Sequence, residues 1–402
     1  MILRSIFLLL ILAALGYKLD HEQREGRFQQ ADDLFLDFLL ANVRDRFVID
    51  AGKVSDQVVL VRLREEDRPE YGAWPPPPID WQMILKGLVP FDPEVVVIST
   101  PLTWGQPPPE FVVEAGEALL PFTSVVLGVE AQVARENATA DPPTIALIKD
   151  TFPLISRIDG DPALLPALSA ITAMPDESIR RQTELGLTPA SPSSDLPFAF
   201  RCAEIVAPSL TLQALSRYTR TPYAQQRLRI GPGAGAHLGG GIYVPLSDHG
   251  LLTAKSSAAI ASVNALNFMT GALADGLSAD DKTKLGKNKI IVIGIDNDTP
   301  QPTSARLHAT ALARTLALPR VHAIGSIARW IICGIAAVLG CFLLRFRGGK
   351  ALRTGLLLIF AALVVSFLTF QSQLIWFPPT VPAAMLGAST LFAMLFGHKP
   401  KP

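Results

Sequence analysis

The chain has 402 residues, of which 49% are hydrophobic and only 18% are charged. Soluble domains carry about 25% charged residues, so this composition favours a membrane protein. The 36 basic residues balance the 36 acidic ones, which argues against nucleic-acid binding, because that function needs a concentrated basic surface. The cysteines are Cys202, Cys333 and Cys341, and the last two lie in apolar segments. No disulfide framework is therefore expected.

The first predicted element is an N-terminal membrane anchor at residues 1–19. Its apolar run over residues 6–17 follows Arg4 and ends at the charged segment that Lys18 begins. The run is shorter than the roughly 20 residues of a spanning helix, so a cleaved signal peptide is the alternative. Apolar residues then recur at helical spacing over residues 34–47, which predicts a helix that leaves the membrane and continues into the next domain.

Residues 20–326 are predicted to form one extracytoplasmic α/β domain. Uninterrupted apolar strands that alternate with amphipathic helices indicate a mostly parallel sheet covered on both faces. Residues 130–150 have weak periodicity and are expected to be rich in loops. The predicted strands are 58–63, 95–99, 124–129 and 289–295, with a small antiparallel group at 228–230, 242–246 and 251–255, and the predicted helices are 81–89, 111–120, 210–218, 256–274 and 305–318.

Three apolar stretches predict a bundle of three membrane helices over residues 327–397. The stretches are 327–346, 352–370 and 374–396. With the N-terminal anchor they give four transmembrane helices, and hence a multi-pass protein of the inner (plasma) membrane.

The orientation of the bundle follows from its basic residues. The first connection holds Arg345, Arg347, Lys350 and Arg353 and no acid, and the short tail at residues 398–402 carries two lysines. Short cationic loops stay in the cytoplasm, so this connection and both chain ends are expected inside. The domain at residues 20–326 is then expected outside the cytoplasm.

The sequence holds no recognisable catalytic or metal-binding constellation. The glycine-rich segment at residues 231–241 lacks the Gly-Lys-Ser/Thr ending of a phosphate loop, so a hairpin-type loop is expected there. Neither a Gly-x-Ser-x-Gly elbow nor a Cys/His cluster with metal-ligand spacing is present. His308 is expected to be packed or capping. We therefore expect no cofactor, no metal and no enzymatic activity, with an exported hydrolase as the weakest alternative.

Polar residues follow three predicted strands and give a candidate ligand site. Right-handed crossovers bring the carboxyl ends of parallel strands to one edge of the sheet, where open α/β sheets bind ligands. Acids gathered there repel one another and favour a cation, an amine or a polyhydroxyl ligand. The alternative is that they form turns and cap helices. The candidate ligand-binding residues are Glu65, Asp67, Trp74, Thr100, Asp296 and Asp298.

Several short motifs follow one another in a characteristic order along the chain. An acidic turn, Glu65-Glu66-Asp67, comes after the first strand. Next come Tyr71-Gly72-Ala73-Trp74-Pro75, the segment Pro-Asp-Glu-Ser-Ile-Arg-Arg at residues 175–181, Pro-Ser-Leu at 208–210, a strand ending in Val-Ile-Gly at 292–294, Thr-Pro at 299–300 and His-Ala at 308–309.

In this order the motifs resemble those of CHASE2 domains, the extracellular sensory domains of bacterial receptors. The layout of one anchor, one domain and three terminal membrane helices is also similar to that of the family. Two departures are local: Pro76, Pro77 and Pro78 replace Trp-Pro-Arg after the first Trp-Pro, and Ser99-Thr100 replaces the acid that usually ends the second strand. CHASE2 receptors normally continue into a cyclase, kinase or other signalling module, and this chain is expected to lack one.

These observations predict a membrane-bound extracytoplasmic sensor without its own catalytic output. Such a protein would signal through, or dock to, a separate membrane or cytoplasmic protein, and a homo-oligomer is a further candidate assembly. The alternative is a structural or scaffolding subunit of an inner-membrane complex. A pocket at the strand ends would favour sensing, whereas a flat surface with an exposed apolar patch would favour scaffolding.

Overall fold

The chain forms two compact units. The α/β unit is Phe47–Pro319, and the helical unit combines Met1–Arg46 with Arg320–Pro402. The α/β unit begins later than the expected domain at residues 20–326, because much of residues 20–46 lies in two helices of the helical unit. The computed structural model describes residues 2–47, 52–105, 107–134, 140–191, 193–255, 259–269, 277–297 and 302–397.

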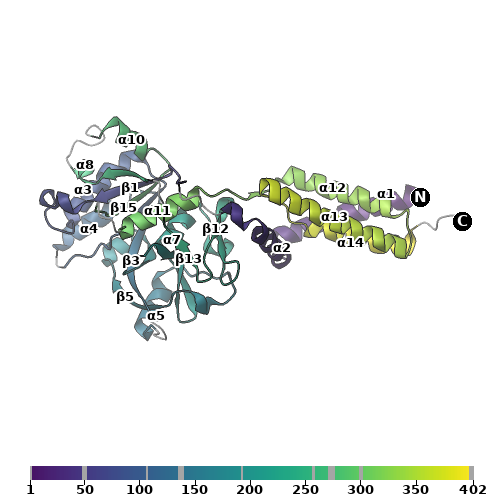
Figure 1. The fold of residues 1–402 in the computed structure, drawn as a ribbon, viewed down its shortest axis with the longest axis horizontal. Coiled ribbons are helices and arrows are strands. Elements are labelled where there is room, and N and C mark those ends of the chain that lie inside the picture. Colours follow the sequence, from purple (N-terminus) through teal and green to yellow (C-terminus); the bar gives the residue numbers. More distant parts are fainter. Residues whose placement is uncertain are drawn as a thin grey trace. The chain divides into compact units, whose positions relative to one another are not determined.

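A seven-stranded sheet forms the centre of the α/β unit (Figure 1). Its strands are β1 (Val58–Leu63), β2 (Val95–Ile98), β3 (Val125–Val133), β5 (Leu168–Ala173), β6 (Glu184–Pro189), β14 (Ala261–Asn264) and β15 (Ile290–Ile295). They are ordered β14-β1-β15-β2-β3-β5, with β6 also paired to β3. These pairings are parallel except that of β5 with β3.

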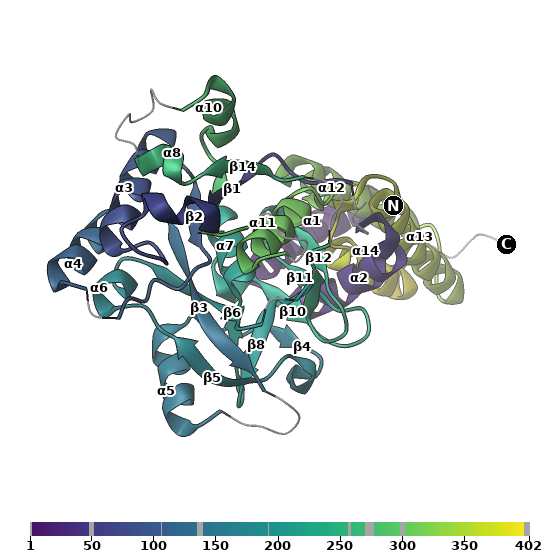
Figure 2. The same ribbon diagram turned by 60° about the vertical axis from the view of Figure 1, so that its left-hand side comes forward.

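Helices cover both faces of this sheet. Apolar side chains alternate along β1, so that Val59 and Val61 join a core with α3 and α4, while Val58 and Leu60 join a second core with α7 and α11. Figure 2 shows α3 and α4 on one side of the sheet and α7 and α11 on the other. This confirms the predicted α/β class with parallel strands flanked by helices. The helices of the unit are α3 (Pro78–Leu88), α4 (Pro109–Glu117), α5 (Pro142–Thr151), α6 (Glu177–Arg180), α7 (Leu210–Tyr218), α8 (Leu266–Met269), α10 (Ala279–Leu285) and α11 (Ser304–Leu316).

Smaller antiparallel sheets extend the unit beyond the central sheet. The glycine-rich segment forms the hairpin between β10 and β11 and continues to β12, as predicted, whereas β13 pairs with β7 instead of joining this group. The additional strands are β4 (Ile158–Asp159), β7 (Asp195–Pro197), β8 (Ala199–Cys202), β9 (Ile205–Pro208), β10 (Arg227–Arg229), β11 (Gly235–His237), β12 (Tyr243–Pro245) and β13 (Leu251–Thr253). Short 3-10 helices are η1 (Arg44–Phe47), η2 (Glu65–Glu70), η3 (Val89–Phe91), η4 (Pro162–Leu164), η5 (Tyr223–Gln225) and η6 (Gly239–Gly241).

Two local predictions were wrong. The expected helix at residues 256–274 holds strand β14 and the single turn α8 within its described part. The Ala/Ser-rich sequence favours a helix locally, but β14 pairs in parallel along the open edge of β1, and this tertiary pairing decides the conformation. The expected loops at residues 130–150 include the end of β3 and helix α5, whose N-cap Asp141 accepts a hydrogen bond from the Thr144 backbone N–H at 3.0 Å.

The helical unit is built from five helices and a short β-bridge within its described residues. Apolar side chains of α1, α12 and α14 form its core, including Leu8, Leu12, Ala336 and Met385. The elements are α1 (Ile2–Arg24), α2 (Gln29–Asn42), β16 (His322–Ala323), α12 (Ser326–Leu343), α13 (Gly349–Gln373), β17 (Ile375–Trp376) and α14 (Thr380–Phe396).

Small residues allow close helix packing in this unit. A Cβ atom added at Gly340 would lie 2.3 Å from the Ser389 hydroxyl oxygen, and one at Gly355 would lie 1.9 Å from that of Thr390. Membrane helices often meet at such small residues. Large apolar side chains such as Leu357 and Phe360 point outward and are exposed, which is typical of a surface that faces lipid.

Two of the described helices, α12 and α13, are long and apolar enough to cross a membrane by length and composition. Four such helices were predicted. Helix α14 is apolar but has 17 residues, because β17 and two prolines occupy the start of the predicted span and a residue before proline avoids the helical conformation. Helix α1 has 23 residues, but charged residues from Lys18 onward shorten its apolar part.

Both ends of the α/β unit continue into segments that bind the connection between α13 and α14. In the segment that precedes the α/β unit, the Arg46 guanidinium donates hydrogen bonds to the backbone carbonyls of Gln371 at 2.5 Å and Ser372 at 3.3 Å. In the segment that follows the α/β unit, β16 pairs in parallel with β17. The Thr380 hydroxyl at the start of α14 also donates to Asp32 of α2. We call residues 371–376 the α13–α14 turn.

A substitution at Gly186 tests how closely α7 packs on the sheet. A Cβ atom at this position in β6 would lie 2.5 Å from the Leu210 Cα atom, at the start of α7. We therefore expect Gly186→Ala to lower the free energy of unfolding by about 1–3 kcal/mol, because backbone atoms must move apart. Gly105→Ala, where nothing lies within 4 Å of the added carbon, is the matched control. Equal thermal stability of the two variants would contradict the packing described.

Candidate functional site

The three strands that end in the predicted ligand residues are neighbours. β15 lies between β1 and β2, and all three are parallel, so their carboxyl ends share one edge as predicted. Glu65 and Asn297 bind each other at this edge: the Glu65 N–H donates to Asn297 Oδ1 at 2.9 Å, and Asn297 Nδ2 donates to the Glu65 carboxylate at 3.2 Å. Asp67 accepts a hydrogen bond from Asn264 Nδ2 at 2.7 Å. Thr100 Oγ1 accepts one from the Ile295 N–H at 3.2 Å.

Asp296 is a fully buried carboxylate with its own partners. Its Oδ1 accepts a hydrogen bond from the Thr303 hydroxyl at 2.6 Å, and its Oδ2 accepts two from Arg306 at 2.8 and 3.2 Å. Thr303 also caps the N-terminus of α11. Asp296 therefore fixes the end of β15 to the start of α11, which agrees with the alternative that these acids cap helices and form turns.

The remaining candidates lie elsewhere. Trp74 packs against Tyr71, with ring centroids 5.7 Å apart, and contacts the apolar core. Asp298 lies outside the described residues. At the carboxyl edge, each described acid of the predicted set thus bonds to a protein side chain, and none of the six predicted residues lines the two cavities described next.

A cavity of about 640 Å³ opens at the opposite, amino edge of the sheet. Its floor is formed by residues that directly precede or begin parallel strands: Glu94 before β2, Ser124 before β3 and Glu184 at the start of β6. The last turn of α7 and the loop after it form the facing wall. Its volume falls within the range of small-molecule sites. The lining residues are Glu94, Phe122, Thr123, Ser124, Val125, Gln182, Thr183, Glu184, Ser216, Arg217, Arg220, Thr221, Pro222 and Tyr223. We call this the amino-edge cavity.

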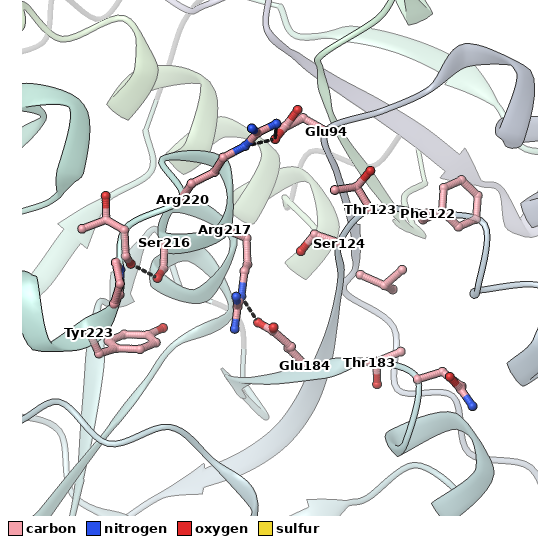
Figure 3. Close-up of a pocket in the computed structure, with 14 residues that line it drawn as sticks. Glu94, Phe122, Thr123, Ser124, Thr183, Glu184, Ser216, Arg217, Arg220 and Tyr223 are labelled. Carbon is pink, nitrogen blue, oxygen red and sulfur yellow. Dashed lines mark hydrogen bonds and ion pairs between the residues drawn. The ribbon is translucent and has the colours of Figure 1, made fainter.

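Glu184 is held in the amino-edge cavity by a hydrogen-bonded chain. The Tyr223 hydroxyl donates to the buried Gln213 side chain, whose Nε2 donates to Glu184 Oε2, and Arg217 Nε donates to the same oxygen. Burial raises the pKa of the Tyr223 phenol, so this group stays protonated and acts as a donor. Figure 3 shows Glu184 and Arg217 meeting in the middle of the cavity. The carboxylate therefore has a fixed orientation.

A second ion pair, between Glu94 and Arg220, lies across the amino-edge cavity (Figure 3). Arg220 donates to Glu94 through Nε at 2.8 Å and Nη2 at 2.7 Å. Arg220 ends α7: its N–H bonds to the Arg217 carbonyl, and the Thr221 N–H bonds to the Ser216 carbonyl. This is a Schellman cap, whose left-handed position is usually glycine. Arg220 takes it with φ of 52°, a conformation that costs a residue with a side chain about 1 kcal/mol or more.

The amino-edge cavity was not predicted from the sequence, because the rule that open α/β sheets bind ligands at the carboxyl ends of strands points to the opposite edge. A signal was present in the polar residues just before strands, such as Ser124 and Glu184, and in two arginines at a helix end. The spacing alone does not show that these segments meet, because α7 and the start of β2 are brought together by the tertiary fold.

A second cavity, of about 480 Å³, lies beside α4 and α6. Its lining is largely apolar and includes Trp104, Val112 and Met174, with Asp176 as its acid. The Asp176 carboxylate accepts hydrogen bonds from the backbone and side chain of Ser178, and these bonds lower its pKa. Asp176 thus serves as the N-cap of α6.

His308 is packed between α11 and α7, which confirms the expectation that it is a packed residue. The side chain is fully buried, and Nδ1 lies 2.8 Å from the Thr211 hydroxyl oxygen. Among the described residues, no group of three or more His, Cys, Asp or Glu side chains is arranged to hold a metal ion.

His308 makes stability depend on pH. Burial lowers its pKa from 6.5 to about 4, so in mildly acidic solution the unfolded chain binds a proton that the folded chain does not. The contribution of neutral His308 to the free energy of unfolding is complete above pH 6.5 and is lost as the pH falls toward 4. We expect the thermal midpoint to fall across this window, and less steeply for His308→Gln. Parallel curves for the two proteins would contradict the prediction.

The structure thus defines a class: an α/β domain with a polar cavity at the amino edge of its sheet, joined in one chain to helices that are long and apolar enough to cross a membrane. Within this class, the family model of the CHASE2 domain matches residues 6–366, nearly the whole chain. The chain therefore belongs to the CHASE2 family, whose domains are extracellular and sensory. Neither a curated protein nor a solved structure matches the chain significantly.

Proposed function

We propose that this CHASE2 protein is a membrane-bound extracytoplasmic sensor that binds a small polar ligand in the amino-edge cavity, without catalytic output of its own. One observation carries the proposal: a concave site contains polar groups held in place by a partly buried hydrogen-bonded network, from Tyr223 through Gln213 to Glu184. Preorganised polar groups in a cavity of this size are typical of specific ligand binding.

The signal would pass through the membrane helices to a separate membrane or cytoplasmic protein. The α13–α14 turn supports this route, because Arg46 and β16, which lead into and out of the α/β unit, both bind to it. A ligand-dependent change that reaches either of these segments would act on the α13–α14 turn. The scaffolding alternative requires no small ligand, so a binding test separates the two functions.

The test is a thermal-shift screen of the full-length protein in detergent, with free amino acids, sugars, polyamines and nucleotides as probes. At least one probe is expected to raise the midpoint of the wild type but not of Glu184→Gln. Asp67→Asn, at the carboxyl edge, is the matched control and should keep the response. A response lost in Asp67→Asn alone would place the site at the carboxyl edge, and no response at all would favour scaffolding. Chemical conversion of the bound probe would contradict the absence of catalysis.

The proposed topology has four spans, α1, α12, α13 and α14, with both chain ends in the cytoplasm. The basic residues of the α12–α13 connection, including Arg347 and Lys350, support it. Reporter fusions made after Gly348 should be active only with a cytoplasmic marker, and fusions after Gln373 only with a periplasmic one. A fusion after Gly397 should again report the cytoplasm. Periplasmic activity at Gly348 would overturn the orientation, and at Gly397 it would reduce the number of spans.

A further inference from the structure

We infer that the amino-edge cavity selects a zwitterion, a free amino acid or short peptide that carries one ammonium and one carboxylate group. This inference rests on the proposed function, since it names the ligand class of the same site. Its basis is that the cavity combines two guanidinium groups and two carboxylates, in the pairs Arg217–Glu184 and Arg220–Glu94.

The charge balance of the lining excludes ligands of a single sign. A free anion such as phosphate would approach Glu94 and Glu184 as well as the arginines, and a polyamine would approach both arginines. Like charges brought together in a partly desolvated site repel strongly. A ligand with one charge of each sign can instead face a partner at each end.

The two arginines keep donor groups available to the cavity. A guanidinium has five N–H groups, and Arg217 uses Nε, while Arg220 uses Nε and Nη2, in the ion pairs described. Their side chains remain 46% and 74% exposed. Ion pairs this exposed add little to stability. Their second role is to present planar donors that bind a ligand carboxylate in bidentate fashion.

The ammonium group has a matching position near Glu184. Gln213 and Arg217 both donate to Oε2 of this carboxylate, so Oε1 can accept from a ligand. The C-terminal end of α7 lies beside it and carries the negative end of the helix dipole, which favours a cation. The hydroxyl groups of Thr123 and Ser124 add neutral hydrogen-bonding groups to the same cavity.

The backbone conformation of Arg220 further supports a binding role for its side chain, because this position favours glycine. With φ of 52° at the Schellman cap of α7, a glycine there would remove backbone strain. The fold therefore gains little from the arginine side chain at this position, because its exposed ion pair with Glu94 adds little to stability. This makes Arg220→Gly a variant in which folding and binding respond in opposite directions.

The test measures by calorimetry how the standard amino acids, about 20 probes, bind to the full-length protein in detergent. These probes are chosen because each carries the ammonium and carboxylate groups that the cavity is inferred to select. For the tightest binder, the N-acetyl derivative, which lacks the α-ammonium charge, and the carboxamide, which lacks the α-carboxylate charge, are compared with the parent. Loss of either charge is expected to weaken binding about ten- to one-hundred-fold. Arg220→Gly and Glu184→Gln should each weaken binding of the parent by a similar factor, while Arg220→Gly keeps or raises the thermal midpoint.

The outcomes separate the ligand class from the proposed function. If no amino acid binds but a sugar binds and is lost in Glu184→Gln, the sensor proposal stands and the zwitterion inference is overturned. Equal binding of the parent and its carboxamide would also overturn it. If Arg220→Gly lowers the thermal midpoint without changing binding, the arginine is structural and the inference fails. No binding by any compound class would remove both proposals.

Discussion

The parallel sheet, buried on both of its faces, is the constraint on which the rest of the α/β unit depends. Consecutive residues such as Val96 and Val97 of β2, or Ile291 and Val292 of β15, are all fully buried. Such strands need apolar layers on both sides, so α3 and α4 cover one face and α7 and α11 the other. The middle of these strands is therefore mostly apolar, and the polar cavity lies at the amino edge of the sheet.

The two edges use their charges differently. At the carboxyl edge each described acid forms hydrogen bonds with nearby protein side chains: Asp67 binds Asn264, and Asp296 binds Arg306 and Thr303. Such groups fix loops to helices. At the amino edge the two ion pairs line an open cavity, and a partly buried hydrogen-bonded network orients the Glu184 carboxylate within it. The contrast arises because the carboxyl ends lead directly into the caps of following elements, whereas the amino ends face the end of α7.

The sequence predicted what depends on local periodicity. The strands at residues 58–63 and 289–295 and the helix at residues 210–218 have the expected bounds within one residue, because their apolar residues repeat with a clear period. The neighbourhood of β1, β15 and β2 also followed from the general rules for parallel sheets. Strand β14 was not predictable in this way, since its short Ala-Ser-Val-Asn segment is a strand only because β1 offers an open edge.

The site was less predictable than the fold for the same physical reason. Glu94 and Arg220 are 126 residues apart in the chain, and no local pattern indicates that they bind each other. The carboxyl-edge acids were predicted as ligand residues because they directly follow strands. Whether such an acid can bind a ligand depends on its protein partners, such as Arg306, which binds Asp296 from a different element ten residues away. Burial and pairing of charged side chains are tertiary properties, which periodicity does not report.

The bridge between β16 and β17 has a mechanical consequence. It consists of two residue pairs, His322 with Ile375 and Ala323 with Trp376, held by backbone hydrogen bonds of 2.9 Å from His322 and Ile324. A ladder this short has no neighbouring register to move into, because a slip of one residue turns its side chains to the other face and leaves a single pair. The segment that leaves the α/β unit is therefore held at the α13–α14 turn in a single register, and this pairing fixes residues 322–324 against residues 374–376.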